Sequence, residues 1–270
     1  MRVVNVLVFL AVFISSANIV ESQSVDNSSV SKGAHAISEQ QRLAALNEAN
    51  QALVNAIPDF TCDETIDAVE QKNGLLKTQT HVTAQFRVVK SRTATSFSLR
   101  DGRTLLTING KPTKKNKFSS PIMLSGVVGY ALGFFNDTNM ACYDVSLRSE
   151  SEHLVEYDLR RKDDISGLKC ATFKLAPRAL VSFDPTTLTM RHFEVAMPSK
   201  KNTESPTMLI NFHTVTLGGN VYDLPETVTS SIATRKGHSS KSWSWQSQYS
   251  GCVLFKATAT ILPDYSEVPQ

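Results

Sequence analysis

Residues 178 to 225 constrain the fold more than any other stretch, because runs of β-branched and aromatic residues alternate there with turn-forming residues. The runs are Ala179 to Phe183, Leu188 to Met197 and Met208 to Leu217. Such runs, separated by short polar segments, predict an antiparallel meander. Asp184-Pro185-Thr186-Thr187 predicts a tight turn between the first two runs, because proline presets φ and the aspartate accepts backbone hydrogen bonds. The polar segment Pro198 to Pro206 predicts the longer loop of a second hairpin.

This stretch also carries a family resemblance. The pattern begins with a strand, continues with the sequence Asp-Pro-x-Thr and an arginine-containing strand, and ends with a later strand before Leu-Pro. The matching residues are Val181, Phe183, Asp184, Pro185, Thr187, Arg191, Phe193, Val215, Leu217, Leu224 and Pro225. The pattern resembles the bacterial periplasmic lipoprotein-sorting proteins (LolA-like, LolB-like and RseB-like), more narrowly a secreted subgroup of them, over roughly residues 38 to 262. The resemblance implies an unclosed antiparallel barrel around an apolar cavity, covered by helices. The family's functional arginine and protruding C-terminal element match no residue here, so lipoprotein transport itself is not carried over.

Residues 1 to 22 have the pattern of an export signal. Met1-Arg2 gives a cationic start, Val3 to Ile14 is apolar, and small residues precede possible cleavage after Ala17 or Ser22. Because a membrane span needs about 20 apolar residues, we predict a cleaved signal peptide, with an uncleaved anchor as the alternative. The serine-rich residues 23 to 37 predict a disordered lead-in. We therefore expect an exported protein, periplasmic or extracellular, with one domain over residues 38 to 265 and no stable membrane span.

Four cysteines fit this compartment. An even number in an exported protein indicates disulfides, and no C-x-x-C pair or zinc-finger spacing is present. Three pairings are possible. We favour Cys142 with Cys170, which flank one compact strand pair, and Cys62 with Cys252, because the last strand of a curled sheet often returns beside the first.

One long helix is predicted after the lead-in. Ser38 and Gln41 form a capping box, and Pro58 stops the helix. Between them an apolar stripe recurs at helical spacing, consisting of Leu43, Leu46, Leu53 and Ile57. The stripe predicts packing on the sheet, and the family resemblance implies that the helix covers a ligand cavity.

The remaining elements are predicted to be mainly strands. Further strands are expected at residues 59 to 67, 82 to 88, 94 to 99, 103 to 108, 141 to 148, 153 to 161, 222 to 229, 232 to 235 and 253 to 262, with Ser230-Ser231 as a turn. The apolar segment 121 to 135 predicts a short buried helix, with a mobile element at the cavity mouth as the alternative. Trp243, Trp245 and Tyr249 share one side of a strand, where they pack in the core or form an aromatic ligand platform. The predicted fold is mainly β (α+β): a curved antiparallel sheet or unclosed barrel with an N-terminal helix packed across it.

Motifs for catalysis and for cofactors are missing from the sequence. It contains no H-E-x-x-H, G-x-S-x-G or P-loop pattern. His192 and His213 lie on neighbouring predicted strands, but without a third ligand we interpret them as ordinary cross-strand neighbours. The formal charge of +3 indicates no nucleic-acid partner. We therefore predict a protein that is not an enzyme and needs no metal or other cofactor.

Two classes of function are compatible with these patterns. The first is a noncatalytic carrier or envelope sensor that binds an acyl chain, a lipoprotein or another apolar ligand between the curved sheet and the helix. The second is a structural or adhesive secreted β-protein that acts through surface loops, and a hydrolase with an unrecognised site is a third alternative. A cavity of the size usual for ligand pockets distinguishes the first from the second. For the first we predict ligand contacts from Leu46, Leu53, Phe193, Val195, Ile210 and Phe212.

Overall fold

The computed structural model describes residues 38–92, 97–114, 126–168, 170, 176–197, 204–236 and 238–255. The predicted signal peptide and lead-in lie outside these residues, as do 198–203 of the predicted loop and 256–262 of the predicted last strand. Residues from Ser38 onward belong to one compact unit. Among the described helices, none has the length and apolar character needed to cross a bilayer.

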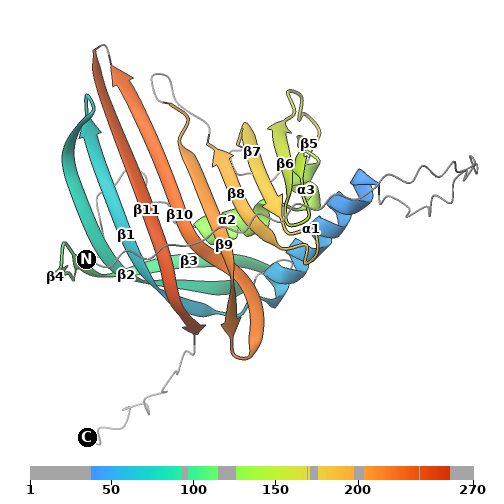
Figure 1. Ribbon diagram of the computed structural model, residues 1–270, viewed down its shortest axis with the longest axis horizontal. Helices are drawn as coiled ribbons and strands as arrows, with labels where there is room; N and C mark the ends of the chain where they lie inside the picture. The colour runs from blue at the N-terminus through green and yellow to red at the C-terminus, as the bar shows by residue number, and fades with distance from the viewer. Residues whose placement is uncertain are drawn as a thin grey trace, which may run out of the picture. The chain divides into compact units, whose positions relative to one another are not determined.

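One sheet of eleven antiparallel strands dominates the structure (Figure 1). The strands are β1 Phe60–Lys72, β2 Leu75–Arg92, β3 Phe97–Ile108, β4 Lys111–Pro112, β5 Tyr143–Glu150, β6 Val155–Arg161, β7 Arg178–Phe183, β8 Met190–Ala196, β9 Thr207–Leu217, β10 Asn220–Lys236 and β11 Ser239–Leu254. Their order is β4-β3-β2-β1-β11-β10-β9-β8-β7-β6-β5, so the first and last long strands pair in the middle. The edges, β4 and β5, are consecutive in sequence and are not joined, which confirms the predicted unclosed antiparallel sheet.

Turn chemistry places most of the predicted hairpins correctly. Asn73-Gly74 and Asn109-Gly110 both have positive φ at each residue, which suits tight hairpins. In the predicted Asp184 turn, the carboxylate accepts hydrogen bonds from the backbone N–H groups of Thr186 and Thr187 at 2.9 and 3.1 Å. The meander around this turn is therefore present as β7, β8 and β9.

Two strand boundaries predicted from the sequence are wrong. Ser230-Ser231 is no turn, because β10 runs through it without a break and pairs there with β9 and β11. The Ser230 hydroxyl donates to the Thr207 carbonyl at 2.8 Å, so cross-strand bonding satisfies a side chain that locally favours a turn. Likewise, the segments predicted at 94 to 99 and 103 to 108 lie within the single strand β3 from Phe97 onward.

A continuous row of side chains shows where the core lies. The registers align partners on eight successive strands, from β6 through β11 and β1 to β2, and each of these side chains is fully buried. They are Tyr157, Val181, Phe193, Ile210, Val228, Ser247, Ile66 and Val82. We call the side of the sheet that carries this row the inner face. Alternation along each strand leaves the other side, the outer face, largely half-buried or exposed.

The N-terminal helix α1, Glu39–Ala56, has the predicted capping box between Ser38 and Gln41. Near its start, Arg42 forms a 2.9 Å ion pair with Glu150 of the edge strand β5. Near its end, the Asn55 carbonyl accepts a 2.6 Å hydrogen bond from Lys90 of β2. The helix therefore spans the open side of the sheet, which confirms the predicted helix packed across it (Figure 1).

Two short helices lie between β4 and β5. They are α2, Val127–Phe134, and α3, Asp137–Met140. The α2 residues Val127, Val128, Ala131 and Leu132 are buried, so this part of the predicted apolar segment is a core helix; residues 121–125 lie outside the described ranges. The chain thus leaves the sheet at one edge, packs a helix into the core and returns at the other edge.

Two disulfides join the predicted pairs. Cys62–Cys252 links the paired strands β1 and β11, and Cys142–Cys170 links the start of β5 to the segment after β6.

Candidate functional site

The apolar part of the inner face contains four of the residues predicted as ligand contacts. Phe193 and Val195 of β8 and Ile210 of β9 are fully buried, and Phe212 of β9 is 6% exposed. Phe193 and Ile210 are register partners, so these side chains form one surface. A ligand-binding role for them stays a prediction.

Helix α2 covers this surface. The Phe134 ring lies 5.1 Å from the Phe193 ring, and the ring of Phe135, just after the helix, lies 5.0 Å from that of Phe183, measured between centroids. Leu46 of α1 is fully buried in the same cluster, and Leu53 is partly buried against it. The predicted ligand contacts therefore lie in the same buried cluster as α2, part of the segment predicted as a buried helix or, alternatively, as a mobile element at the cavity mouth.

Polar side chains hold α2 at both ends. Asp101 of β3 accepts hydrogen bonds from the backbone N–H groups of Gly126 and Val128 at the start of the helix. At its other end, the buried Asn50 side chain of α1 donates to the carbonyls of Leu132, at 2.6 Å, and Phe135, at 3.1 Å. These bonds satisfy groups that a helix end leaves without a partner. Between its ends α2 carries no charged residue and is held by apolar contacts.

A buried ion pair interrupts the apolar inner face. Arg103 Nε lies 2.6 and 2.9 Å from the carboxylate oxygens of Glu64, and their side chains are 7% and 0% exposed. The Ser247 hydroxyl donates to Glu64 at 2.6 Å, and Arg103 donates to the Tyr249 hydroxyl at 3.2 Å. We call Glu64, Arg103, Ser247 and Tyr249 the polar centre.

Aromatic rings enclose the polar centre. The Arg103 guanidinium lies 5.3 Å from the ring centroids of both Phe86 and Trp245, within cation–π range. Trp245 is 1% exposed, and its indole N–H has no hydrogen-bond partner among the described residues. Of the three aromatic residues predicted on one side of a strand, Trp245 and Tyr249 therefore belong to this centre.

Protonation at the polar centre follows from its surroundings. Burial lowers the pKa of Arg103, but the neighbouring Tyr249 and Glu64 outweigh burial and the net shift is upward. Burial raises the pKa of Tyr249, with the Glu64 charge as a further cause. At neutral pH the centre therefore contains a charged guanidinium and a protonated phenol.

The polar centre was not predicted from the sequence. Glu64 occupies an inward position of the alternating pattern Phe60, Cys62, Glu64, Ile66, and this inward charge was the available signal. Its partner is 39 residues away, so the pair depends on the β1–β2–β3 register.

Metal binding has no support in the described part of the chain, where no group of three or more potential ligands is found. His192 lies opposite Asn211, with Nδ1 and Oδ1 2.9 Å apart, and His213 lies opposite Leu224 on the next strand. The two histidines are thus cross-strand neighbours of other residues.

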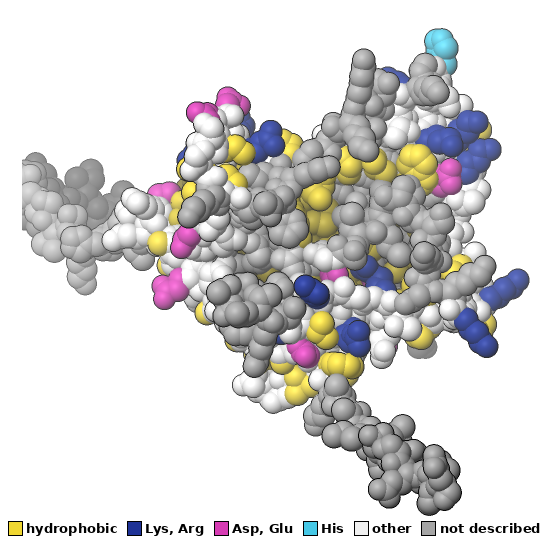
Figure 2. Space-filling view, turned by 180° about the vertical axis from the view of Figure 1, so that it is seen from behind, with side chains coloured by type: hydrophobic (Ala, Val, Ile, Leu, Met, Phe, Trp, Pro, Cys, Tyr) yellow, Lys and Arg dark blue, Asp and Glu magenta, His cyan; other side chains and the backbone are white. Residues whose placement is uncertain are grey.

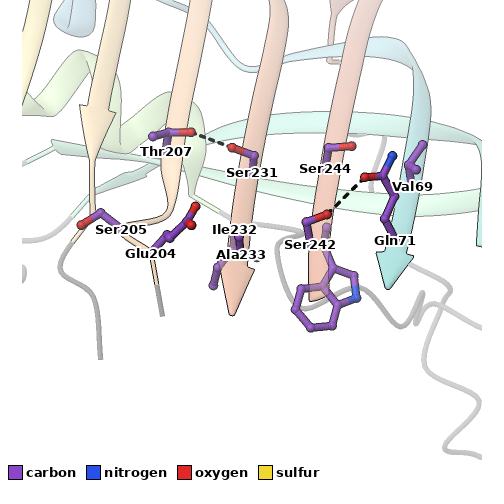
Figure 3. Close-up of a pocket in the computed structure, with 11 residues that line it drawn as sticks. Val69, Gln71, Glu204, Ser205, Thr207, Ser231, Ile232, Ala233, Ser242 and Ser244 are labelled. Carbon is purple, nitrogen blue, oxygen red and sulfur yellow. Dashed lines mark hydrogen bonds between the residues drawn. The ribbon is translucent and has the colours of Figure 1, made fainter. Parts of the chain in front are cut away.

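The outer face has an open groove of about 310 Å³ across β1, β11, β10 and the start of β9 (Figure 3). It is lined by Val69, Gln71, Glu204, Ser205, Thr207, Ser231, Ile232, Ala233, Ser242, Trp243 and Ser244. The Thr207 and Ser231 hydroxyls are 2.9 Å apart, and Ser242 donates to Gln71 at 3.4 Å. Hydroxyl side chains and the Gln71 amide alternate in this lining with apolar residues such as Ile232 and Trp243, so the open groove offers polar groups as well as apolar ones to a ligand.

Three comparisons with known proteins leave the family open. No protein-family model matches the chain, and no curated protein matches it. A DUF1329 family protein from Desulfovibrio piger is similar in structure at 12% identity and a TM-score of 0.32, over 77% of this chain and 93% of that one. A LolA superfamily protein from Nitrosomonas europaea is similar at 11% identity and a TM-score of 0.34, over 80% and 94%. The Pseudomonas aeruginosa MucA/MucB complex gives 9% identity and a TM-score of 0.21, over 77% and 92%.

These solved structures include a LolA superfamily protein and MucB, which are of the kind that the sequence resembles. Such low identities and TM-scores carry no argument about activity or ligand. The function therefore has to be argued from the residues of this chain.

Proposed function

We propose that this chain is a noncatalytic exported protein that binds an acyl chain or another apolar ligand between the inner face and the helices α1 and α2. The observation that carries the proposal is the cover of the inner face: a single eight-residue apolar helix tied at its ends, rather than a second sheet. The side-chain hydrogen bonds described for this helix lie at its two ends, so its displacement as a unit would expose a continuous apolar surface.

The polar centre supports a ligand with one polar end. Arg103, Tyr249 and the Trp245 indole N–H lie on the same face as the apolar row. An acyl chain along Phe193 and Ile210 would leave its carboxyl or ester group free to meet these donors. An amphiphile fits this distribution better than a hydrocarbon.

Export is supported by the two disulfides together with the predicted signal peptide. Disulfides persist in oxidising compartments and are rare in the cytosol. A carrier or sensor in such a compartment meets lipids and acylated proteins, which are ligands of the proposed chemistry.

The outer-face groove favours a second candidate, a secreted β-protein that binds polar surfaces. Its hydroxyl-rich lining is available without any movement of α2. This candidate requires no ligand on the inner face, so a test for an apolar ligand there distinguishes it from the proposed carrier.

Uptake of a fluorescent fatty acid by the purified protein tests the proposal. We expect saturable binding, and faster binding by Asp101→Ala, because this change removes both acceptors that hold the start of α2. Asp63→Ala is the matched control, since Asp63 is exposed on the outer side of β1.

Mass spectrometry of an organic extract of protein from its native source provides the second measurement. A copurifying fatty acid, phospholipid or acylated peptide would support the carrier. A protein with no extractable ligand, combined with no probe uptake by the wild type or by Asp101→Ala, would refute it and favour the surface-binding candidate.

A further inference from the structure

Two hairpins end side by side at one end of the sheet. The β1–β2 hairpin turns at Asn73-Gly74, and its Asn73 N–H donates to the Ser240 carbonyl in the β10–β11 hairpin at 2.9 Å. In return, the Ser240 N–H donates to the Asn73 side chain at 2.9 Å. We call residues 71–77 together with Arg235 and residues 238–242 the paired hairpin tip. These bonds hold the two turns in one unit.

The tip exposes two adjacent leucines. Leu75 is 72% exposed and Leu76 is 59% exposed. Leu75 pairs with Lys72 and Leu76 pairs with Gln71, so the two side chains point to opposite faces of the sheet. A partner that docks on one face alone can cover one leucine but not both.

Cations surround the leucines. Lys72 of β1 lies directly opposite Lys241 of β11, an arrangement of like charges that is unfavourable in a sheet. Lys77 and Arg235 are also exposed, and none of the four has an ion pair in the described part of the chain. Residues 71–77 and 227–250 contain no aspartate or glutamate. Figure 2 shows Lys and Arg side chains at its upper right, with hydrophobic side chains and an acidic side chain beside them.

We propose that the paired hairpin tip docks on the surface of an anionic lipid bilayer. A bilayer interface surrounds an inserted tip on both sides, so it buries both leucines at once. The cations then lie at the level of the lipid headgroups, where anionic lipid attracts them and relieves the repulsion between Lys72 and Lys241. Exposed apolar residues within a basic ring are typical of such interfacial contacts.

Cosedimentation of the full chain with vesicles tests this proposal. We expect binding to phosphatidylcholine vesicles that contain phosphatidylglycerol, weaker binding to phosphatidylcholine alone, and release as the salt concentration rises. The double change Leu75→Ser/Leu76→Ser is expected to weaken binding at least about tenfold. The matched control is Val221→Ser/Val253→Ser, which removes exposed apolar side chains, 64% and 58% exposed, from the other ends of β10 and β11.

Lys72→Glu separates docking from folding. It places opposite charges at the Lys72–Lys241 position, so the midpoint of unfolding is expected to stay or rise while vesicle binding falls more than about tenfold. The proposal is overturned if the wild-type protein does not bind anionic vesicles, or if the control changes Val221→Ser/Val253→Ser weaken binding as much as the leucine changes do. If the chain instead forms a dimer that depends on Leu75 and Leu76 and does not bind vesicles, the partner of the tip is a second copy of the chain and the proposal is wrong. Leu75 and Leu76 are exposed at the tip and are not among the inner-face residues proposed to contact the acyl ligand, so the effect of changing them is distinguishable from a failure of the proposed carrier function.

Discussion

Glu64 and Arg103 place two full charges in a face that is otherwise mainly apolar. Both side chains are almost completely buried, and Ser247 and Tyr249 complete their hydrogen bonds. A buried pair of this kind contributes little net stability, but removing one partner leaves the other charge without compensation. The pair is therefore better explained as a fixed polar point on the inner face than as a source of stability.

We expect Glu64→Gln and Arg103→Met each to lower the free energy of unfolding by about 3 to 5 kcal/mol. The double variant is expected to lose clearly less than the sum, because no unpaired charge remains. Denaturant unfolding of the four proteins measures this coupling. Arg160→Met is the control, since the Arg160 side chain is 71% exposed and Asp158 keeps its ion pair with Arg178, so the loss is expected to be about 1 kcal/mol or less. Additive losses would show that the two charges act independently.

At the scale of elements, helix α2 is notable for how closely it packs on the sheet. It packs so closely on β3 that a Cβ at Gly129 would collide with the backbone carbonyl oxygen of Leu99. A backbone atom cannot rotate away as a side chain does, so the helix itself would have to move. Glycine at this position therefore sets the depth at which α2 covers the inner face.

Gly129→Ala is expected to destabilise the protein by about 1 to 3 kcal/mol, the usual range for overpacking, and to accelerate uptake of the acyl probe. Gly133→Ala in the same helix is the matched control, because nothing lies within 4 Å of a Cβ there. That change should be neutral or stabilise the helix by about 0.5 to 1 kcal/mol. Thermal unfolding of both variants measures this difference in stability. Equal stabilities would mean that the position of α2 does not depend on its close contact with β3.

At the scale of the whole molecule, the first and last long strands of the chain are neighbours inside the sheet. β1 and β11 are neighbours, and Cys62–Cys252 joins them across a sequence separation of 190 residues. Cys142–Cys170 spans 28 residues at the edge strand β5. The first disulfide thus constrains nearly the whole described chain, and the second constrains one hairpin.

We expect Cys62→Ser/Cys252→Ser to lose more stability than Cys142→Ser/Cys170→Ser. Loop closure in the unfolded chain predicts losses of about 5 and about 3.5 kcal/mol, respectively. Chemical denaturation of the two variants under oxidising conditions measures both stability losses. The wild-type protein in reductant, with both disulfides reduced, serves as the reference. The reverse order would indicate that local packing around β5 outweighs chain entropy.

The sequence by itself determined the elements whose causes are local. The Ser38–Gln41 capping box, the Asp184-Pro185 turn and the alternation in β7 to β9 depend on residues a few positions apart, so each was predicted without knowledge of the fold. The resemblance indicated the unclosed sheet, and the expected neighbourhood of the first and last strands favoured Cys62 with Cys252. The Ser230-Ser231 turn was wrong because pairing with β9 and β11 outweighs the local preference of serine.

Only the tertiary structure decided the features that define the candidate site. Strand registers bring Glu64 to Arg103 and Lys72 opposite Lys241, and helix packing brings α2 to Phe193, between residues 39 to 169 positions apart. Which face of each strand is buried also depends on the helix that covers it, and a local pattern does not contain that helix. The sequence therefore predicted the kind of sheet, and long-range packing determined where its charges and its exposed leucines lie.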